Sequence, residues 1–195
     1  MKRPKRAKKL KQPFRLIIKL LVLAVIVLAL KSGFDTAFEM VYPLRHDDVI
    51  TQYSQEYSLD RYLVMGVIKA ESNYIHDAHS GVARGLMQIT DDTAKWIAGK
   101  LNIEFTADDI EDPDTNIRMG CYYLSYLINR YGDINVALAA YNGGMGNVDK
   151  WLSDSRYSSD GKTLSDIPFP ETEKYVERVN KYTGIYKWWY SKDKS

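Results

Sequence analysis

The 195-residue sequence predicts a mostly α-helical domain behind one N-terminal transmembrane helix. Three observations predict this fold class. An apolar run of membrane-spanning character follows a basic N-terminal segment. Beyond that run, apolar residues recur at helical spacing between capping residues. No stretch of the sequence alternates convincingly between apolar and polar residues, so any sheet is expected to be small and to lie near Ser80–Ile89.

The N-terminal segment is first basic and then apolar. Residues 1–31 contain 10 Lys and Arg side chains and no acidic one, and residues 20–30 are apolar without interruption. Positive charge ahead of an apolar run predicts a cytoplasmic N-terminus, with the rest of the chain on the other side of the membrane. A cleaved signal peptide is the alternative, but the small-residue pattern Val27-Leu28-Ala29 lies inside the apolar run.

We therefore expect an uncleaved anchor followed by one large domain. Pro43 breaks any helix that continues from the anchor. The expected divisions are a basic cytoplasmic tail (1–13), a transmembrane signal anchor (14–31), a stalk (32–45) and a catalytic domain (46–195).

The charge of the chain is divided between its two parts. The 164 residues after the basic segment contain 17 basic and 25 acidic side chains, a net charge of −8. A nucleic-acid-binding domain usually has the opposite sign, so no nucleic-acid partner is expected. The single cysteine, Cys121, excludes an internal disulfide and is expected to be a core residue. His76 and His79 lack a third ligand at useful spacing, and we expect neither a metal nor a cofactor.

Capping signals define the helices of the large domain. Ser58 is the candidate N-cap of the second helix. Asp112 followed by Pro113 is typical of a helix start, and Gly132 of a helix end. The expected helices are Asp47–Tyr57, Leu59–Asn73, one from Thr90 or Asp91 through Ile97, Pro113–Tyr131, Ile134–Tyr141, Asn147–Leu152 and Glu171–Tyr190.

Glu71 departs from the pattern of its helix. Helical spacing connects it to Ile68, Val67 and Val64, so its carboxylate continues an apolar stripe. Loss of hydration there, and the negative end of the helix dipole, both raise the pKa of a carboxylic acid. A raised pKa suits a general acid at neutral pH. An ordinary surface glutamate at a helix end has the same spacing, and both interpretations stay open at this point.

Two glycine-containing segments place polar groups in apolar surroundings. In Gly81–Thr90, Gln88 stands between two apolar residues and needs a hydrogen-bond partner or a ligand. In Ala139–Val148, small residues precede Tyr141 and Asn142, an aromatic ring and an amide of the kind that contacts sugars. A tight turn before a helix and a helix C-cap are the alternative interpretations of the two segments.

Taken together, these segments occur in the order of a known family. The sequence resembles the soluble lytic transglycosylase (SLT-type) domain, whose fold is mostly helical and lysozyme-like, similar to goose-type lysozyme. The resemblance covers about residues 46–190. It is carried by Glu71-Ser72-Asn73-Tyr74, Gly85-Leu86-Met87-Gln88-Ile89, Asp112-Pro113-Asp114-Thr115-Asn116-Ile117, Ala140-Tyr141-Asn142-Gly143-Gly144 and Ile167-Pro168-Phe169-Pro170-Glu171-Thr172.

The resemblance implies cleavage of the glycosidic bond from N-acetylmuramic acid to N-acetylglucosamine in peptidoglycan. It implies that Glu71 is the catalytic acid and base. Arg84 stands where the family often has a small residue. The resemblance further implies that six residues line the glycan groove: Met87, Gln88, Tyr141, Asn142, Glu171 and Tyr175.

The number of carboxylates selects the mechanism. A retaining or inverting glycosidase needs two carboxylates, one as the acid and one as the nucleophile or base. Neither Asp77 nor Asp91, the acids near Glu71, matches a catalytic position of the family. One carboxylate suffices if it protonates the leaving oxygen and then takes a proton from the primary hydroxyl of the muramic sugar, which closes an anhydro ring without water.

Two other functions remain as alternatives. One is a hydrolytic muramidase on the same fold, and the other is a non-catalytic peptidoglycan-binding component of an envelope-spanning apparatus. In each case the expected partners are peptidoglycan strands and the cytoplasmic membrane. The catalytic domain is expected to lie on the cell-wall side of that membrane.

Overall fold

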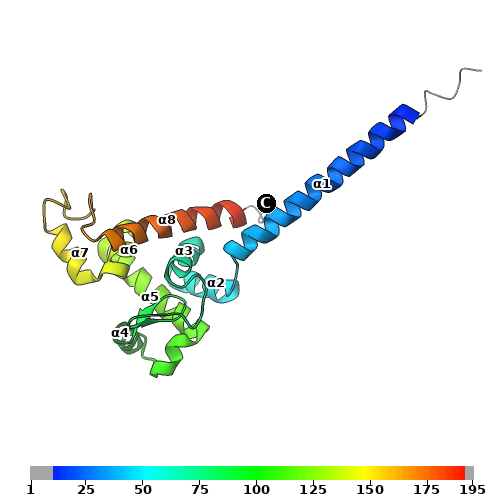
Figure 1. Cartoon of the computed structure of the whole chain (residues 1–195). Coiled ribbons are helices and arrows are strands. Elements are labelled where there is room, and N and C mark those ends of the chain that lie inside the picture. Colours follow the sequence, from blue (N-terminus) through cyan, green and yellow to red (C-terminus); the bar gives the residue numbers. More distant parts are fainter. Residues whose placement is uncertain (1–10, 192–195) are drawn as a thin grey trace, which may run out of the picture. The chain divides into compact units, whose positions relative to one another are not determined.

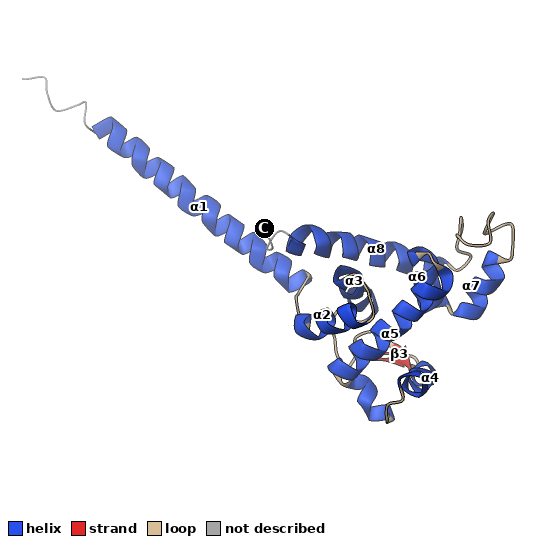
Figure 2. Cartoon of the chain, turned by 180° about the vertical axis from the view of Figure 1, so that it is seen from behind, coloured by secondary structure: helices blue, strands red, loops and turns tan. Residues whose placement is uncertain are grey.

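The computed structural model describes residues 11–191, which divide into two compact units between Leu44 and Arg45. The first unit contains a single long helix, and the second contains all other helices and strands. Figures 1 and 2 show the two units from opposite sides.

The first unit is α1 (Lys11–Val41), whose stretch Phe14–Val41 is long and apolar enough to cross a membrane. A helix of 31 residues is about 46 Å long, which exceeds the roughly 30 Å of a bilayer core. The helix continues to Val41, so most of the stalk expected over residues 32–45 is helical. Gly33 alone is a weak helix breaker, and the stronger breaker, Pro43, comes after the helix has ended. Residues 1–10 of the expected basic tail lie outside the described residues.

The second unit is built from helices around a very small sheet. Its elements in chain order are α2 (Asp47–Glu56), α3 (Arg61–Glu71), β1 (His79–Ser80), β2 (Ala83–Arg84), β3 (Ile89–Thr90), α4 (Asp91–Leu101), the 3₁₀ helix η1 (Ala107–Glu111), α5 (Pro113–Tyr131), α6 (Ile134–Gly143), α7 (Met145–Leu152) and α8 (Pro170–Tyr190). The mostly helical fold class is confirmed, and the small sheet lies where the sequence predicts it.

Side-chain caps account for where several helices begin. The Asp112 carboxylate accepts from the backbone N–H of Thr115, and Gly132 closes the same helix with a left-handed backbone (φ 70°). The expected cap of α3 was wrong. Asp60, not Ser58, accepts from the first turn, because Ser58 has a left-handed φ of 56° and an N-cap requires an extended backbone.

The three strands form one antiparallel sheet in the order β1-β2-β3. Each strand has two residues, so the sheet is a folded loop between α3 and α4 rather than a layer of the core. Figure 2 shows β3 next to α4 and α5. This position brings the segment between β2 and β3 under the central helix α5.

The core of the second unit is formed mainly by facing helices. α3 packs along α8, and α6 packs against both α5 and α8 (Figure 1). The apolar stripe predicted for α3 is confirmed, since Val64, Val67 and Ile68 are fully buried. Cys121 on α5 is also fully buried, as the sequence predicts, and burial raises the pKa of its thiol. The stripe on α3 leads to Glu71 at its last turn.

Candidate active site

Glu71 is the last residue of α3, and dense protein surrounds its carboxylate. Burial raises the pKa of Glu71 to about 7, against the smaller lowering effects of the Tyr175 hydroxyl and the Arg178 guanidinium. The residue as a whole is half-buried. A carboxylic acid that is half-protonated near neutral pH can donate a proton to a substrate bound beside it.

Tyr175 approaches Glu71 from the facing helix α8. The tyrosine is 1% exposed, and its hydroxyl makes no hydrogen bond of ordinary geometry. The hydroxyl nevertheless lowers the pKa of Glu71. Burial and the negative charge of Glu71 in turn raise the pKa of Tyr175. Tyr175 and Glu71 therefore influence each other's pKa, but Tyr175 offers a sugar almost no surface.

The segment between β2 and β3 is fixed by the side chain of Asn116. This residue is buried on α5, and its amide donates to the carbonyl oxygens of Arg84 (3.0 Å) and Ile110 (2.7 Å). Its Oδ1 accepts a 2.7 Å hydrogen bond from the backbone N–H of Met87. A Cβ atom at Gly85 (φ 79°) would overlap the Asn116 amide, so this close approach requires glycine.

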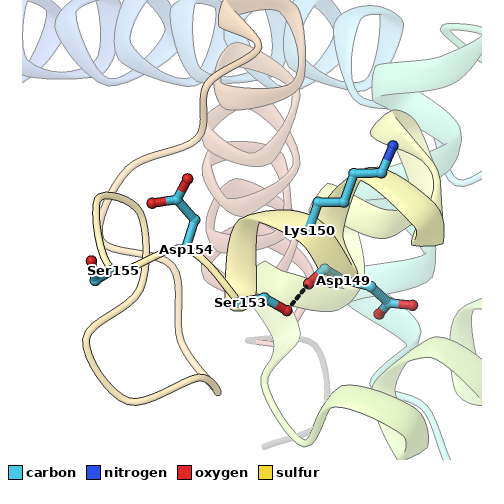
Figure 3. A pocket seen from close by; sticks show the side chains of 5 residues that line it. All are labelled: Asp149, Lys150, Ser153, Asp154 and Ser155. Atoms are coloured by element: carbon cyan, nitrogen blue, oxygen red, sulfur yellow. Dashed lines mark hydrogen bonds between the residues drawn. The ribbon is translucent and has the colours of Figure 1, made fainter.

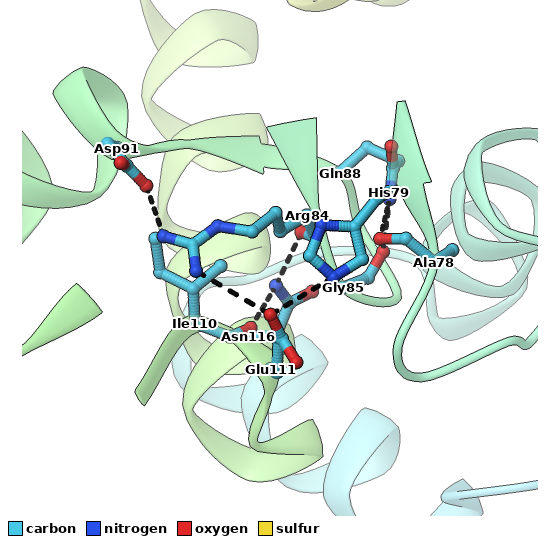
Figure 4. Close-up of polar contacts among 9 residues, drawn as sticks. All are labelled: Ala78, His79, Arg84, Gly85, Gln88, Asp91, Ile110, Glu111 and Asn116. Atoms are coloured by element: carbon cyan, nitrogen blue, oxygen red, sulfur yellow. Dashed lines mark hydrogen bonds and ion pairs between the residues drawn. The ribbon is translucent and has the colours of Figure 1, made fainter. Parts of the chain in front are cut away.

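Gln88 is held by the same segment. Its Nε2 donates to the carbonyl oxygens of Ala78 (2.9 Å) and Gly85 (2.8 Å), as Figure 4 shows. The sequence predicts that the Gln88 amide needs a hydrogen-bond partner or a ligand. Backbone carbonyl groups of the surrounding loop satisfy its Nε2. Its Oε1 is buried and has no hydrogen-bond partner among the described residues, which leaves one acceptor of this amide unsatisfied.

Met87 has a supporting position instead of an exposed one. Its side chain is fully buried, and a Cβ atom at Gly120 of α5 would overlap it. Its carbonyl oxygen accepts a 2.8 Å hydrogen bond from the Tyr141 hydroxyl. In this structure the Met87 side chain has no surface that could touch a glycan, because the loop directs it into the core.

Tyr141 lies near the end of α6 and is half-buried. Its ring contacts the ring of Tyr123 with 5.3 Å between centroids. Burial raises the pKa of Tyr141, and the charge of Glu71 adds to this effect. Tyr141 is therefore a neighbour of the carboxyl group, and its hydroxyl is already engaged within the protein.

Asn142, which follows Tyr141 directly in the chain, and Glu171 are exposed. They line an open hollow of about 400 Å³ together with Phe169 and Thr172. The Thr172 hydroxyl donates a 2.8 Å hydrogen bond to Asn142 Oδ1, which joins α6 to the first turn of α8. Two of the predicted site residues, Asn142 and Glu171, thus line this hollow.

Arg84, a long side chain where the resembled family often has a small one, has a structural role. Its guanidinium pairs with Asp91 and, at 3.5 Å, with Glu111, whose carboxylate also contacts His79 at 3.1 Å. Figure 4 shows these contacts joining the sheet to α4 and η1. Arg84 therefore braces the segment that holds Gln88.

Another hollow, of about 600 Å³, lies at the end of α7 (Figure 3). It is lined by Asp149, Lys150, Ser153, Asp154 and Ser155, and the Ser153 hydroxyl donates to the Asp149 carbonyl at 2.7 Å. It contains none of the predicted site residues. Although larger than the hollow beside Asn142, it is not the candidate site. Within residues 11–191, no cluster of three or more potential metal ligands is present.

Asn116 and Thr172 are two supporting residues that the sequence prediction did not assign to the site. Asn116 is a buried amide beside the buried Ile117 on α5, and a polar residue on the apolar face of a helix was the available signal. Thr172 follows Glu171 directly, but only the fold shows that it reaches Asn142.

A helical unit with a small antiparallel sheet and a half-buried glutamic acid at a helix end has the organisation of a lysozyme-like domain. The chain belongs to the Transglycosylase SLT domain family, which matches residues 48–164. The family resemblance found in the motifs is thereby confirmed.

Known relatives match the second unit. The soluble lytic murein transglycosylase of Salmonella typhimurium is 33% identical over 151 residues, which cover 75% of this chain and 23% of that protein. The membrane-bound lytic murein transglycosylase C of Serratia proteamaculans is 28% identical over 169 residues, covering 71% and 46% of the two proteins. The chain spans about a quarter of the length of the soluble relatives.

A solved structure has the same fold. An inactive mutant of the lytic transglycosylase Slt from Pseudomonas aeruginosa superposes with a TM-score of 0.68 and 33% sequence identity. The match covers 77% of this chain and 25% of the Slt chain.

Proposed function

We propose that this chain is a peptidoglycan lytic transglycosylase in which Glu71 is the only catalytic carboxyl group. The observation that carries the proposal is the environment of Glu71, a half-buried acid with a pKa of about 7 beside two tyrosines. The relatives are named lytic murein transglycosylases, and the inactive Slt mutant has glutamine in place of one glutamate, which agrees with a single essential acid.

The reaction follows from one acid that is used twice. Protonated Glu71 donates its proton to the glycosidic oxygen while the bond from that oxygen to the muramic C1 breaks. The Glu71 carboxylate then takes the proton of the muramic primary hydroxyl as its oxygen bonds to C1. Glu71 ends protonated again, no water is consumed, and the product carries a 1,6-anhydro ring.

The charges that act on Glu71 agree with a route that uses one acid. Within the described part of the chain, burial raises the pKa of Glu71, Tyr175 and Arg178 lower it, and no carboxylate is among these causes. A hydrolase with two carboxylates would instead need a second one within about 10 Å. Tyr175 and Gln88 are proposed to position the substrate, the first through Glu71 and the second through its unpaired Oε1.

The other groove residues have separate proposed roles. Tyr141 presents its ring to the glycan, Met87 supports Tyr141 through its carbonyl oxygen, and Asn142 and Glu171 bind sugar or peptide groups at their hollow.

Product analysis tests the proposal directly. The full-length protein in detergent is incubated with purified peptidoglycan, and the fragments are resolved by mass. Anhydro-muramic ends, which are lighter by one water than hydrolytic ends, are the expected result. Hydrolytic ends alone would indicate a muramidase, and an absence of fragments would favour a non-catalytic wall-binding component.

We further propose that α1 anchors the protein uncleaved, with residues 1–13 in the cytoplasm and residues 46–195 on the cell-wall side. The apolar surface of α1 and the basic charge before it support this topology, and the Serratia relative is named membrane-bound. Protease added to intact spheroplasts is expected to digest the domain and leave a membrane-protected N-terminal fragment. Full protection of the domain would reverse the topology.

A further inference from the structure

The C-terminal end of α8 carries an exposed tryptophan among lysines. Trp188 is 55% exposed, while the other tryptophans of the chain are buried or half-buried. Residues 181–191 combine several aromatic rings with Lys181 and Lys187 and contain no acidic residue. Amphipathic aromatic rings and lysines are the side chains that gather where a membrane meets water. A single exposed apolar residue is ordinary on a protein surface, so Trp188 is informative only together with its neighbours.

Trp188 belongs to one exposed stripe of α8. Helical spacing places Glu173, Glu177, Lys181, Gly184 and Trp188 on the same side of the helix, and all five are exposed. The stripe is acidic at its N-terminal end and basic and aromatic at its C-terminal end. A Cβ atom at Gly184 would meet nothing within 4 Å, so a flat surface can approach the backbone there.

Contacts within the second unit bring this end of α8 next to the start of the unit. Lys187 Nζ lies 3.4 Å from Asp60 Oδ2 at the N-cap of α3. The neighbouring Arg61 pairs with Asp47 at the start of α2. Figures 1 and 2 both show α3 beside α8, with α2 next to α3. Arg45, with which the unit begins, is exposed and precedes α2 directly, so the chain enters the unit at the end that carries the basic and aromatic part of the stripe.

A short tether makes even a weak membrane contact effective. Residues 42–44 lie between Val41, the last residue of α1, and Arg45. This segment spans at most about 14 Å when it is extended. A short link between two binding elements gives the second one an effective concentration of about the millimolar range. A face that could not recruit a free protein to a membrane can therefore be occupied in an anchored one.

We propose that the C-terminal end of α8 docks on the cell-wall-side surface of the membrane that holds α1. Trp188 lies in the interfacial layer, and Lys181 and Lys187 face the headgroups of anionic phospholipids. The proposal rests on the topology proposed for α1 and adds a second membrane contact for the domain. The 164 residues after the basic N-terminal segment have a net charge of −8. Because an anionic surface repels such a domain as a whole, its basic end determines which side turns toward the membrane.

Docking would also orient the candidate active site. α3 begins after Asp60, which contacts Lys187, and ends at Glu71, whose pKa the Tyr175 hydroxyl near the start of α8 lowers. With 11 residues, α3 is about 16 Å long. The docking face and Glu71 thus lie at opposite ends of α3. The docked domain directs Glu71 away from the membrane, toward glycan strands that lie close above its surface.

A fluorescent label at position 184 reports the docking. Gly184→Cys is labelled with a nitrobenzoxadiazole group, which Cys121 does not take up because it is fully buried and its thiol pKa is raised. The full-length protein is reconstituted into vesicles of phosphatidylcholine and phosphatidylglycerol that contain a lipid quencher near the headgroups. We expect about twofold quenching at position 184, and none for the same label in Glu173→Cys, about 16 Å away on the same stripe.

Substitutions in the labelled Gly184→Cys protein test which groups hold the face. Trp188→Ala is expected to remove most of the quenching, and Trp188→Tyr, which keeps an amphipathic ring, to retain it. Lys181→Gln should lower the ratio of docked to undocked protein about fivefold, the effect of one lysine near an anionic surface. Lys174→Gln, exposed on the first half of α8, is the matched control and should leave the ratio unchanged. Raising the salt from about 0.1 M to about 1 M should weaken docking, because charge attraction is then screened within about 3 Å.

Three results would overturn the docking face. They are equal quenching at positions 173 and 184, quenching that survives Trp188→Ala, and equal docking on vesicles of phosphatidylcholine alone. Quenching that rises with the number of protein molecules per vesicle would indicate a second copy of this chain as the occupant and would also overturn it. Flotation of the protein with the vesicles tests the anchoring by α1 separately, and a failure to float would overturn the anchor and the docking together. Since none of these measurements needs turnover, none decides the lyase activity, which the peptidoglycan products test.

Discussion

The Tyr141 hydroxyl donates a 2.8 Å hydrogen bond to the main-chain carbonyl oxygen of Met87. This bond ties the end of α6 to the segment before β3, which also carries Gln88. The bond fixes Tyr141, whose pKa the charge of Glu71 raises, while the Met87 side chain packs against Gly120 of α5. One hydrogen bond thus joins two of the motifs by which the sequence resembles its family.

Tyr141→Phe removes this bond and keeps the ring. We expect the free energy of unfolding to fall by about 1 kcal/mol and turnover of peptidoglycan to fall several-fold, because the segment carrying Gln88 loses its tie. Denaturant unfolding and turnover are measured on the same preparations. Tyr62→Phe, at the opposite end of α3 from Glu71, is the control and should change neither.

Tyr141→Ala extends the test to the ring. We expect it to lose more than tenfold in turnover per folded molecule, because the glycan is no longer held over Glu71. Truncation of a core aromatic costs about 3–5 kcal/mol of stability, and the half-buried Tyr141 should cost less. A large loss of stability with normal turnover would make Tyr141 a packing residue only.

Local signals account for the parts of the fold that the sequence predicts well. α5 begins after Asp112 and ends at Gly132 as expected, because a carboxylate cap, a proline and a left-handed glycine act within a few residues. The start of α3 was missed because Ser58 and Asp60 are both suitable caps. Only the backbone angle of Ser58, set by how α2 ends, selects Asp60.

The site was predictable where it depends on helical spacing and less so where it depends on contacts between distant segments. The buried stripe of α3 leads to Glu71, so its raised pKa could be expected from sequence. The burial of Met87 depends on Gly120, and the shape of its loop depends on Asn116. Both contacts span about thirty residues, and no local pattern encodes them.

Gly120→Ala tests the packing beneath the loop. The added methyl group would overlap the Met87 side chain, including its Cβ, which cannot swing away. We expect a net destabilisation of about 1–2 kcal/mol and reduced turnover, because Met87 moves together with its carbonyl oxygen. Gly99→Ala on α4 meets open space and should be neutral or stabilising. Equal stability of the two variants in denaturant unfolding would contradict the contact.

Residues 45–195 are expected to fold without α1. This unit contains its own core, and its boundary lies at Arg45. The excised domain should be soluble, give a helical circular dichroism spectrum and unfold cooperatively on heating. Aggregation or a non-cooperative transition would show that the chain before Arg45 is needed for folding.

The activity should decline above neutral pH. Because the proposed acid must be protonated and its pKa is about 7, kcat/KM is expected to fall tenfold per pH unit above that value. Arg178 lowers the pKa of Glu71, so Arg178→Gln should move this decline to higher pH. Lys174→Gln, also exposed on α8, is the control. A decline that does not move in Arg178→Gln would place the titrating group elsewhere.

Glu71→Gln should abolish turnover and yet stabilise the fold in a pH-dependent way. An amide cannot donate the proton, so we expect a loss of at least ~10²–10⁴-fold. The folded pKa of about 7 exceeds the ordinary value of 4.5. Below pH 4.5 the acid is protonated in both states, and this group adds no pH dependence.

As the pH rises from 4.5 to 7, the unfolded chain releases this proton before the folded chain does. The wild-type protein therefore loses stability over this interval, and Glu71→Gln does not. The difference in unfolding free energy between Glu71→Gln and the wild-type protein should grow with pH. It should level off above pH 7 and amount to roughly 3 kcal/mol at most. Glu173→Gln, an exposed change on α8, should show no such growth. Urea unfolding at a series of pH values measures this, and parallel curves for wild type and Glu71→Gln would show that Glu71 is hydrated, contrary to its proposed role.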